Sequence, residues 1–425
     1  MFESLLYSIK KIVPHSIFSF FQPAYHRTMA FIAAVIYRFP SRKLIVIGVT
    51  GTKGKSSVTE ILNAILEEAG LKTALSNTIR FKIDDKSGAN LYKMSMPGRM
   101  FIQRFLRRAL NAGCTHVVLE VTSQGAMMHR HRHIDFDGLI YTGLAPEHIE
   151  AHGSYENYKK AKLTIAEAVA RSSKPRRVFV GNSDDKEYAD FAAYDFTEKH
   201  PCSLSDAQPY ELGPDGFDMT CDGMRIHSHL SGAFNVWNAL SAMTMAKAFG
   251  VSTETAKKAI EKIEKIAGRV EKIDVGQNFS VVVDYAHTPD SLQKLYDVYK
   301  GTRRICVLGN TGGGRDTWKR DEMAKIAESA CDEMILTNED PYDDDPKKIV
   351  DDMAAAVSPA AREKKLHIVM DRREAIAKAL SLARSGDSVL ITGKGTDPYI
   401  MGPNNTKEPW SDARVTREEL MKIKK

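Results

Sequence analysis

The sequence predicts an α/β protein in which two successive units each hold a mostly parallel sheet covered by helices. From Leu44 onward, short apolar runs of strand length alternate with longer segments of helical period. This alternation is typical of parallel strands that are buried on both faces. It runs in two series, the second of which starts near Gly268. A chain of 425 residues also exceeds the length that one core usually serves, which favours more than one domain.

The apolar runs of the first series are too short for helices and too rich in Val, Ile and Leu for loops. The expected strands are 44–49, 116–121, 138–142 and 177–180, and the expected helices are 55–69, 99–112 and 155–171. Between residues 200 and 230, turn formers such as Pro209, Pro214 and Gly223 predict an irregular or antiparallel insertion.

The second series predicts another α/β domain, with helical stretches between its strands. Its expected strands are 279–284, 304–308, 333–337, 366–369 and 388–392. We therefore expect three parts. They are a short basic and aromatic segment at 1–43, a central domain at 44–265 and a C-terminal domain at 266–425.

Composition narrows the class of protein. With 43% hydrophobic and 27% charged residues, the chain falls in the ordinary range of soluble proteins, and no apolar run approaches the roughly 18 residues of a membrane span. The net charge of +6 is spread along the chain, so nucleic-acid binding is not expected. The five cysteines show no C-x-x-C spacing, so we expect neither a disulfide framework nor a zinc site, and a cytoplasmic location.

The segment 1–43 is the exception to this even spread of charge. Glu3 is its one acidic residue, and its basic residues are interleaved with aromatic residues. Two interpretations remain open. The favoured one is a docking segment whose aromatic side chains pack on the enzyme, and the other is a peripheral contact with an anionic membrane surface. The basic residues are Lys10, Lys11, Arg27, Arg38, Arg42 and Lys43.

A glycine-rich loop, Gly48-Val49-Thr50-Gly51-Thr52-Lys53-Gly54-Lys55-Ser56-Ser57, lies between the first expected strand and the first expected helix. In that context backbone N–H groups and the helix N-terminus can surround phosphate oxygens. Lys55 would reach the terminal phosphates and Ser56 would hold a magnesium ion. The loop predicts an ATP site with contacts at Gly51, Thr52, Lys53, Gly54, Lys55, Ser56 and Ser57.

The spacing of this loop, T-G-T-x-G-K-[ST], resembles that of the Mur ligase family and its folylpolyglutamate relatives. The resemblance covers nearly the whole chain after residue 43 and is greatest to the tripeptide synthetases of that family. It implies a P-loop-type central ATPase domain with a mostly parallel sheet, followed by a Rossmann-like C-terminal ligase domain. The other segments that carry it are Leu119–Gly125, Thr142–His148, Tyr158–Lys162, Gly232–Asn238, Gly268–Glu271 and Asp284–Asp290.

The resemblance implies a catalytic centre with two magnesium ions. Glu120 and His148 would be metal ligands beside Ser56, and Lys162 of Y-x-x-A-K would be carbamylated, with Lys55 completing the catalytic set. A carbamate turns an ammonium into an anion that can stand near divalent cations. The further ATP contacts that the resemblance implies are Asn235, Arg269, Asp284 and His287.

Substrate residues follow from the same resemblance. Ser95, Thr122 and Arg130 match positions that contact the acceptor, and Arg320 is a candidate for the carboxylate of the amino acid. The segment at Asp340 and Tyr342 stands where diaminopimelate enzymes have D-N-P-R, so diaminopimelate is disfavoured, because tyrosine cannot bind a second carboxylate bidentately. The segment Gly393–Asp397 departs from the family's G-K-G-H-E, with Gly393 kept and Asp397 in place of the glutamate. Asp397 keeps the negative charge that would hold the ammonium of the amino acid.

The expected reaction is ATP-dependent peptide-bond formation through an acyl phosphate, in which a monomer adds an amino acid to a UDP-MurNAc-dipeptide-like precursor. Segment 1–43 is shorter than the UDP-binding domain of the family, which leaves three alternatives. The uridine could be held loosely, the acceptor could be lipid-linked, or a partner could supply a domain. One rival class is a folylpolyglutamate or cyanophycin-type ligase, and the D-Y-A-H-T-P-D segment argues against the folylpolyglutamate type. The other is a non-catalytic ATP-binding subunit, which is disfavoured because the catalytic set is complete.

Overall fold

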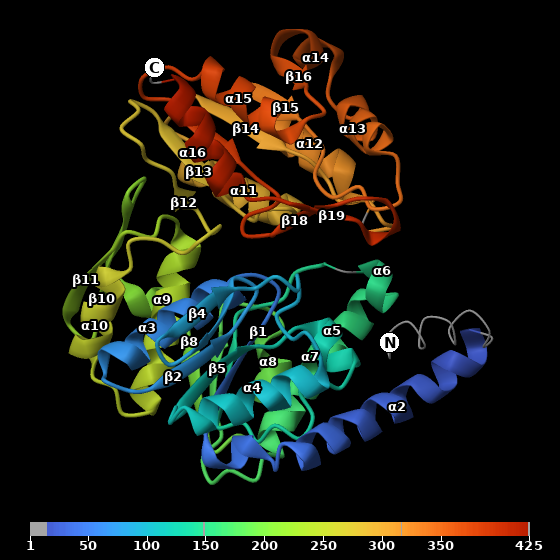
Figure 1. Ribbon diagram of the computed structural model, residues 1–425. Helices are drawn as coiled ribbons and strands as arrows, with labels where there is room; N and C mark the ends of the chain where they lie inside the picture. The colour runs from blue at the N-terminus through green and yellow to red at the C-terminus, as the bar shows by residue number, and fades with distance from the viewer. Residues whose placement is uncertain (1–14, 148, 316, 424–425) are drawn as a thin grey trace.

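The structure is a computed structural model that describes residues 15–147, 149–315 and 317–423. Two main sheets lie one after the other along the chain, an eight-stranded sheet followed by a six-stranded sheet (Figure 1). We call the two units built on them the central domain and the C-terminal domain. The α/β fold class with mostly parallel sheets is confirmed.

The eight-stranded sheet has the order β4-β3-β2-β5-β1-β6-β7-β8, with β1 in its interior. All neighbours pair in parallel except β2 with β3 and β3 with β4, which form an antiparallel edge. Its strands are β1 Ile45–Thr50, β2 Thr73–Ser76, β3 Arg80–Ile83, β4 Lys86–Ala89, β5 His116–Glu120, β6 Gly138–Tyr141, β7 Val178–Asn182 and β8 Glu198–Cys202.

Both faces of this sheet are covered because successive residues of a strand point to opposite sides. Ile47 and Val49 of β1 join one apolar core with α3 Lys55–Glu68, α9 Ala233–Ala248 and α10 Thr253–Lys262. Val46 joins the core on the other face, which the remaining helices cover. Those helices include α4 Arg99–Asn111, α5 Ser123–Met127, α7 Tyr155–Ala170 and α8 Tyr188–Ala192, with α6 Ile149–His152 beside α7.

The predicted insertion is an antiparallel sheet of three strands, β9 Tyr210–Gly213, β10 Gly216–Cys221 and β11 Met224–Ser228. Phe217, Met219 and Ile226 from its inner face enter the core that α3 and α9 share. The insertion therefore braces α9, which follows the sheet directly in the chain.

The C-terminal sheet has the order β12-β13-β17-β14-β15-β16 and is parallel except for the short strand β12. Its strands are β12 Glu271–Lys272, β13 Ser280–Val283, β14 Arg304–Leu308, β15 Glu333–Leu336, β16 Leu366–Ile368 and β17 Ser388–Ile391. Its helices are α11 Pro289–Val298, α12 Lys319–Ala330, α13 Pro346–Ala355, α14 Pro359–Lys365, α15 Arg372–Leu382 and α16 Asp412–Ile423, and a separate hairpin joins β18 Tyr399–Met401 to β19 Lys407–Pro409.

One expectation from the cysteines is wrong. The structure joins Cys306 of β14 to Cys331, which follows α12, by a disulfide whose Cα atoms are 6.1 Å apart. The two residues are 25 positions apart, and only the packing of α12 beside the sheet brings them together. Spacing along the chain carried no sign of this pair.

The N-terminal helix α2 His15–Ile36 packs along α4. Arg107 of α4 fixes its end by donating from Nη2 to the carbonyl oxygen of Tyr37 at 2.7 Å. The end of this helix is thus held on α4, but the aromatic side chains of Tyr25 and Phe31 are exposed, so the two interpretations of segment 1–43 stay open. No helix among the described residues is long and apolar enough to cross a bilayer.

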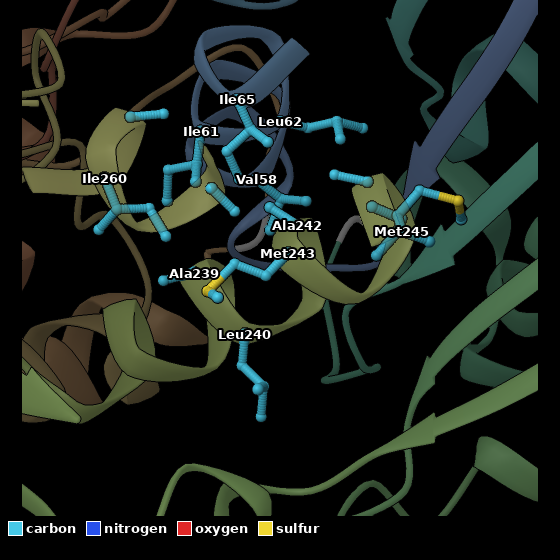
Figure 2. Close-up of a cluster of buried hydrophobic side chains, with 14 of the residues drawn as sticks. Val58, Ile61, Leu62, Ile65, Ala239, Leu240, Ala242, Met243, Met245 and Ile260 are labelled. Carbon is cyan, nitrogen blue, oxygen red and sulfur yellow. The ribbon is translucent and has the colours of Figure 1, made fainter. Parts of the chain in front are cut away.

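The core between α3 and α9 provides a test of the fold. Ile61 is fully buried there against residues of α9 and α10 (Figure 2). We expect Ile61→Ala to lower the free energy of unfolding by about 3 kcal/mol, because it removes apolar contacts and leaves a cavity. Urea unfolding followed by circular dichroism measures this loss. The matched control is Ile368→Ala, whose side chain is 49% exposed, with an expected loss below about 1 kcal/mol; equal losses would contradict the packing.

Candidate active site

The glycine-rich loop connects β1 to α3 and fits closely against its neighbours. Gly51 and Gly54 have φ values of 145° and 81°, in the region that favours glycine. A Cβ atom on Gly51 would overlap the hydroxyl of Thr142, and one on Gly54 would lie 2.6 Å from Oδ1 of Asn238. Thr142 also donates from Oγ1 to the carbonyl oxygen of Lys53 at 2.6 Å. The loop is therefore held in one shape at the N-terminus of α3.

Lys55 and Ser56 begin α3, where backbone N–H groups have no helical partner and favour anions. The ammonium of Lys55 donates to the carbonyl oxygen of Thr52 at 2.8 Å, which folds the side chain back over the loop. Burial lowers the pKa of Lys55 despite the opposing effects of Glu120 and Glu147. The loop thus holds a desolvated cation where a triphosphate would lie.

Glu120 ends β5 beside the loop because β5 pairs with β1 in parallel, with Val49 opposite Glu120. Its carboxylate accepts hydrogen bonds from Ser56 Oγ at 2.8 Å, Ser95 Oγ at 2.8 Å and Thr78 Oγ1 at 2.9 Å. Burial alone would raise the pKa of Glu120, but the Lys55 ammonium and these donors outweigh it, so the pKa lies below its ordinary value. Glu120 is therefore an anion at neutral pH.

Lys162 of α7 reaches the same loop from the other side. Its ammonium donates to the carbonyl oxygen of Gly51 at 2.6 Å, and its side chain is among the most buried in the protein. Burial, followed by the repulsion of Lys55, lowers the pKa of Lys162 well below its ordinary value. The predicted metal ligand His148 lies outside the described residues.

The C-terminal domain brings Arg269 to the phosphate loop. Its Nη2 atom donates to Ser56 Oγ at 3.4 Å, and its guanidinium lies 4.5 Å from the ring centroid of Tyr285. Asp284 shapes this edge by accepting from the backbone N–H groups of Val270 and Ala286, both at 2.7 Å. Burial raises the pKa of Asp284 despite these donors and Arg269.

Glu147 links the two domains. Its Oε1 atom lies 2.9 Å from the ammonium of Lys53 and 3.0 Å from Nε2 of His287. The other ring nitrogen of His287 lies 2.6 Å from the carbonyl oxygen of Tyr285. The predicted ATP contacts Lys53 and His287 are thus brought together across the interface by a carboxylate for which the sequence analysis gave no role.

A cavity of about 700 Å³ opens beside the loop and is lined by both domains. Of the predicted ATP contacts, Lys53, Gly54, Ser57, Arg269, Asp284 and His287 line it. Asn235 does not; instead it holds Asn238, whose Nδ2 donates to Asn235 Oδ1 at 2.9 Å. Asn238, Phe234 and Trp237 line the cavity. All three lie in the segment Gly232–Asn238 that carries the resemblance, from which only Asn235 was predicted as an ATP contact.

The predicted acceptor residues lie on the other side of Glu120. Ser95 bonds Glu120, and Thr122 caps α5 by accepting from the N–H of Gly125 at 3.1 Å. Burial, with Arg99 next, lowers the pKa of Arg130 to about 10. Its guanidinium donates to the carbonyl oxygen of Met96 in the loop that also carries Ser95. The structure therefore ties Ser95 and Arg130 to one loop.

The predicted amino-acid residues meet at the edge of the C-terminal sheet. The ammonium of Lys394 lies 2.7 Å from Asp340 and 3.6 Å from Asp397, so the two carboxylates share it. Gly393, which has a φ of 104°, lies against Glu339. A side chain on Gly393 would displace that carboxylate.

The structure places Arg315 and Arg320, which precede Tyr342 in the chain, in different surroundings. The guanidinium of Arg315 lies 4.8 Å from the ring centroid of Tyr342 and donates to its hydroxyl at 3.0 Å. Arg320 is buried on α12 and donates to Asp352 of α13 at 2.9 Å. The role of Arg320 stays a prediction, and Arg315 is the arginine that the structure brings to Tyr342.

A glycine-rich loop at the N-terminus of a helix, with a second α/β domain contacting it across a cavity, is the arrangement of a nucleotide-dependent α/β enzyme. The sequence comparisons identify the family. The Mur ligase middle domain matches residues 49–246, and the glutamate ligase domain of Mur ligases matches residues 268–395. The chain belongs to the Mur ligase family, whose members are ATP-dependent ligases.

Individual relatives cover most of the chain. A UDP-N-acetylmuramyl-tripeptide synthetase of Roseiflexus sp. (strain RS-1) is 33% identical over 93% of this chain and 82% of its own. A UDP-N-acetylmuramoyl-L-alanyl-D-glutamate–2,6-diaminopimelate ligase of Geobacillus kaustophilus (strain HTA426) is 36% identical over 92% of this chain and 82% of its own. A solved structure of a ligase of the latter name superposes with a TM-score of 0.61 at 26% identity, covering 90% of this chain and 79% of its own.

The fit of the glycine-rich loop gives a prediction for ATP binding. We expect Gly54→Ala to weaken ATP binding by at least about tenfold, because the new methyl group would displace Asn238 and strain the backbone. Isothermal titration calorimetry with ATP measures the change. Gly70→Ala is the matched control, since Gly70 has a φ of 75° but nothing within 4 Å of its Cβ position. If both variants weakened ATP binding equally, backbone strain alone would explain the loss, which would contradict the role of the contact with Asn238.

Proposed function

We propose that this enzyme uses ATP to join an amino acid to a muramyl-peptide acceptor through an acyl phosphate, releasing ADP and phosphate. The observation that carries the proposal is the meeting of Lys55, Ser56 and Glu120 with Arg269 of the other domain at one loop. Such a site concentrates positive charge where a phosphoryl group passes from ATP to a carboxylate. We place the reaction in the cytoplasm, where ATP is supplied.

ATP would lie in the interdomain cavity, with its phosphates on the loop Gly51 to Ser57 and its base toward Phe234 and Trp237. The N–H groups at the start of α3 and the Lys55 ammonium would bind the phosphates. Arg269, stacked on Tyr285, would neutralise charge that develops on the transferred phosphoryl group. Each of these groups already points to the loop in the protein alone.

The donors beside the loop fit magnesium, which prefers oxygen ligands and keeps water or phosphate oxygens in its shell. Ser56 and Glu120 present a hydroxyl and a carboxylate 2.8 Å apart. Among the described residues, no group of three or more His, Cys, Asp or Glu side chains could hold a metal ion. We expect two magnesium ions, which would neutralise the phosphates when bound. Ser56 and Glu120 would be ligands of one ion and His148 of a second, beside phosphate and an anion at Lys162.

A carbamate on Lys162 would supply that anion. Only a neutral amine attacks CO₂, and the lowered pKa of Lys162 raises the fraction of the side chain that is neutral. The modification would also relieve the repulsion between the two buried cations, Lys55 and Lys162, because it reverses one of the charges. The carbamate would then stand between Gly51 and the phosphates.

In the second half of the reaction, the amine of the amino acid would attack the acyl phosphate and phosphate would leave. This intermediate hydrolyses in water, so the domains must close over it. The contact of Glu147 with Lys53 and His287 holds the closed arrangement. Asp340 and Asp397 would hold an ammonium of the amino acid, with its carboxylate toward Arg315 beside Tyr342.

The acceptor would enter on the side of Ser95, Thr122 and Arg130, with its reacting carboxylate toward Lys55. The placement of Ser95 on Glu120 supports this path, because the same loop then touches acceptor and catalytic carboxylate. The relatives act on UDP-linked muramyl peptides by name, and we propose the same class of acceptor here. A lipid-linked acceptor is the alternative that the test below separates.

The central test is amino-acid-dependent ADP release with UDP-muramyl-dipeptide and a panel of amino acids. We expect Lys55→Ala to lower the rate by about a hundredfold or more, because it removes a cation that acts on the transferred group. Lys72→Ala, at a side chain that is 58% exposed, is the control. Wild-type turnover in Lys55→Ala would refute the site. Turnover only with a lipid-linked acceptor would change the acceptor and keep the chemistry.

The carbamate gives a separate prediction. Native mass spectrometry at neutral pH should show the mass of one added CO₂, which Lys162→Met removes together with activity. Lys160→Met is the control, because Lys160 is exposed on the same helix. Acidification should release the CO₂, since protonating the amine reverses the addition. An unmodified Lys162 in fully active enzyme would contradict the proposal.

A further inference from the structure

Lys93 crosses from the central domain into the C-terminal domain. Its ammonium lies 2.6 Å from Oδ2 of Asp340 and 2.9 Å from Oδ2 of Asp397. The three side chains are 15%, 4% and 11% exposed, so this is a largely buried ion pair rather than a surface contact. No family motif in the sequence includes Lys93.

The two carboxylates are held in place without Lys93. Oδ1 of Asp340 accepts from the ammonium of Lys394 at 2.7 Å and from the N–H of Met401 at 2.8 Å. Its other oxygen, Oδ2, faces Lys93. Asp397 lies 3.6 Å from Lys394. Two carboxylates thus share one lysine of their own domain, which leaves a negative charge and two oxygen atoms for a second ammonium. We call these two atoms the ammonium seat.

The loop that carries Lys93 is built to hold it there. Asn90 donates to the carbonyl oxygens of Asn77 and Met94, at 2.8 and 3.0 Å, and thereby closes the loop on both sides of Lys93. Lys93 itself has a φ of 52°, a conformation that costs free energy for any residue other than glycine. Ser95, two residues further on, bonds Glu120. One short loop therefore touches both the ammonium seat and the catalytic carboxylate.

We propose that Lys93 is an internal competitor of the amino acid, whose ammonium takes the place of the Lys93 ammonium in the seat. This inference rests on the proposed function, in which Asp340 and Asp397 hold an ammonium of the amino acid. Before the amino acid binds, Lys93 neutralises the buried carboxylates. When the amino acid enters, Lys93 must leave the seat, and its loop is then free to shift at Ser95. Lys93 thus sets how tightly the enzyme binds its amino acid.

A purely structural role for Lys93 makes the opposite prediction. If the lysine only joined the domains, its removal would loosen the closed state, raising KM for the amino acid and lowering kcat. If it competes, its removal lowers KM with little effect on kcat. The size of the effect follows from occupancy: a seat filled by Lys93 nine-tenths of the time weakens binding of the amino acid by about tenfold.

A binding experiment tests the ammonium seat without any turnover. The probe is n-butylammonium, which has the chain length and charge of a lysine side chain, and n-butanol is the uncharged control. By calorimetry, full-length Lys93→Ala should bind n-butylammonium in a saturable way, at least about tenfold more tightly than wild type. Lys86→Ala, at an exposed lysine of the neighbouring strand, should behave as wild type. Adding Asp340→Asn to Lys93→Ala should abolish binding. Absence of binding to Lys93→Ala, or binding that survives Asp340→Asn, would overturn the proposal.

A kinetic experiment then tests the competition itself, with the amino acid that the panel identifies. In Lys93→Met we expect KM for that amino acid to fall by about tenfold while kcat stays within about twofold. A KM that rises or does not change would overturn the role of Lys93 as a competitor. If no amino acid supports turnover, the proposed function fails, and the n-butylammonium result still decides whether the seat exists.

Discussion

The charge balance at the phosphate loop is the constraint on which the rest of the structure depends. Lys55 and Lys162 bury two ammonium groups around one turn of backbone. Burial lowers the pKa of both groups, and Lys55 lowers the pKa of Lys162 further. Glu120 and Glu147 offset part of this charge. An excess of buried positive charge costs free energy, and a bound anion, a modified lysine or the loss of a proton would recover it. The positive charge at the loop would therefore favour the binding of a triphosphate.

Sheet geometry delivers these charges to one place. Parallel strands end at the same edge of a sheet, so β1 and β5 bring the loop and Glu120 together with no direct link along the chain. The C-terminal sheet repeats the arrangement, since Asp340 follows β15 and Asp397 follows β17 at its corresponding edge. Residues of both domains line the cavity beside the loop, which fits the proposed placement of ATP between the domains.

Three polar contacts between the domains lie at the proposed site. Arg269 reaches Ser56, His287 reaches Glu147, and Lys93 reaches Asp340. Each joins a charged or polar group of one domain to a group of the other. Because such contacts can exchange a protein partner for a substrate at modest cost, an interface of this kind suits an enzyme that opens and closes in each cycle.

The sequence by itself determined the strand and helix positions near the site, because buried parallel strands must be apolar runs and the loop must carry glycine at Gly51 and Gly54. It also predicted roles for Lys55 and Glu120 from motifs, and the structure places Glu120 at Ser56 beside Lys55. It missed β2, β3 and β4 on one side of the central sheet and β8 at its other edge. These strands are less apolar than the ones it predicted. Only the tertiary structure decided that Asn238 rather than Asn235 lines the cavity, that Cys306 joins Cys331, and that Lys93 fills the ammonium seat. The reason is physical: these outcomes depend on groups from separate elements that meet only when the sheets and domains pack, and no local pattern along the chain records such meetings.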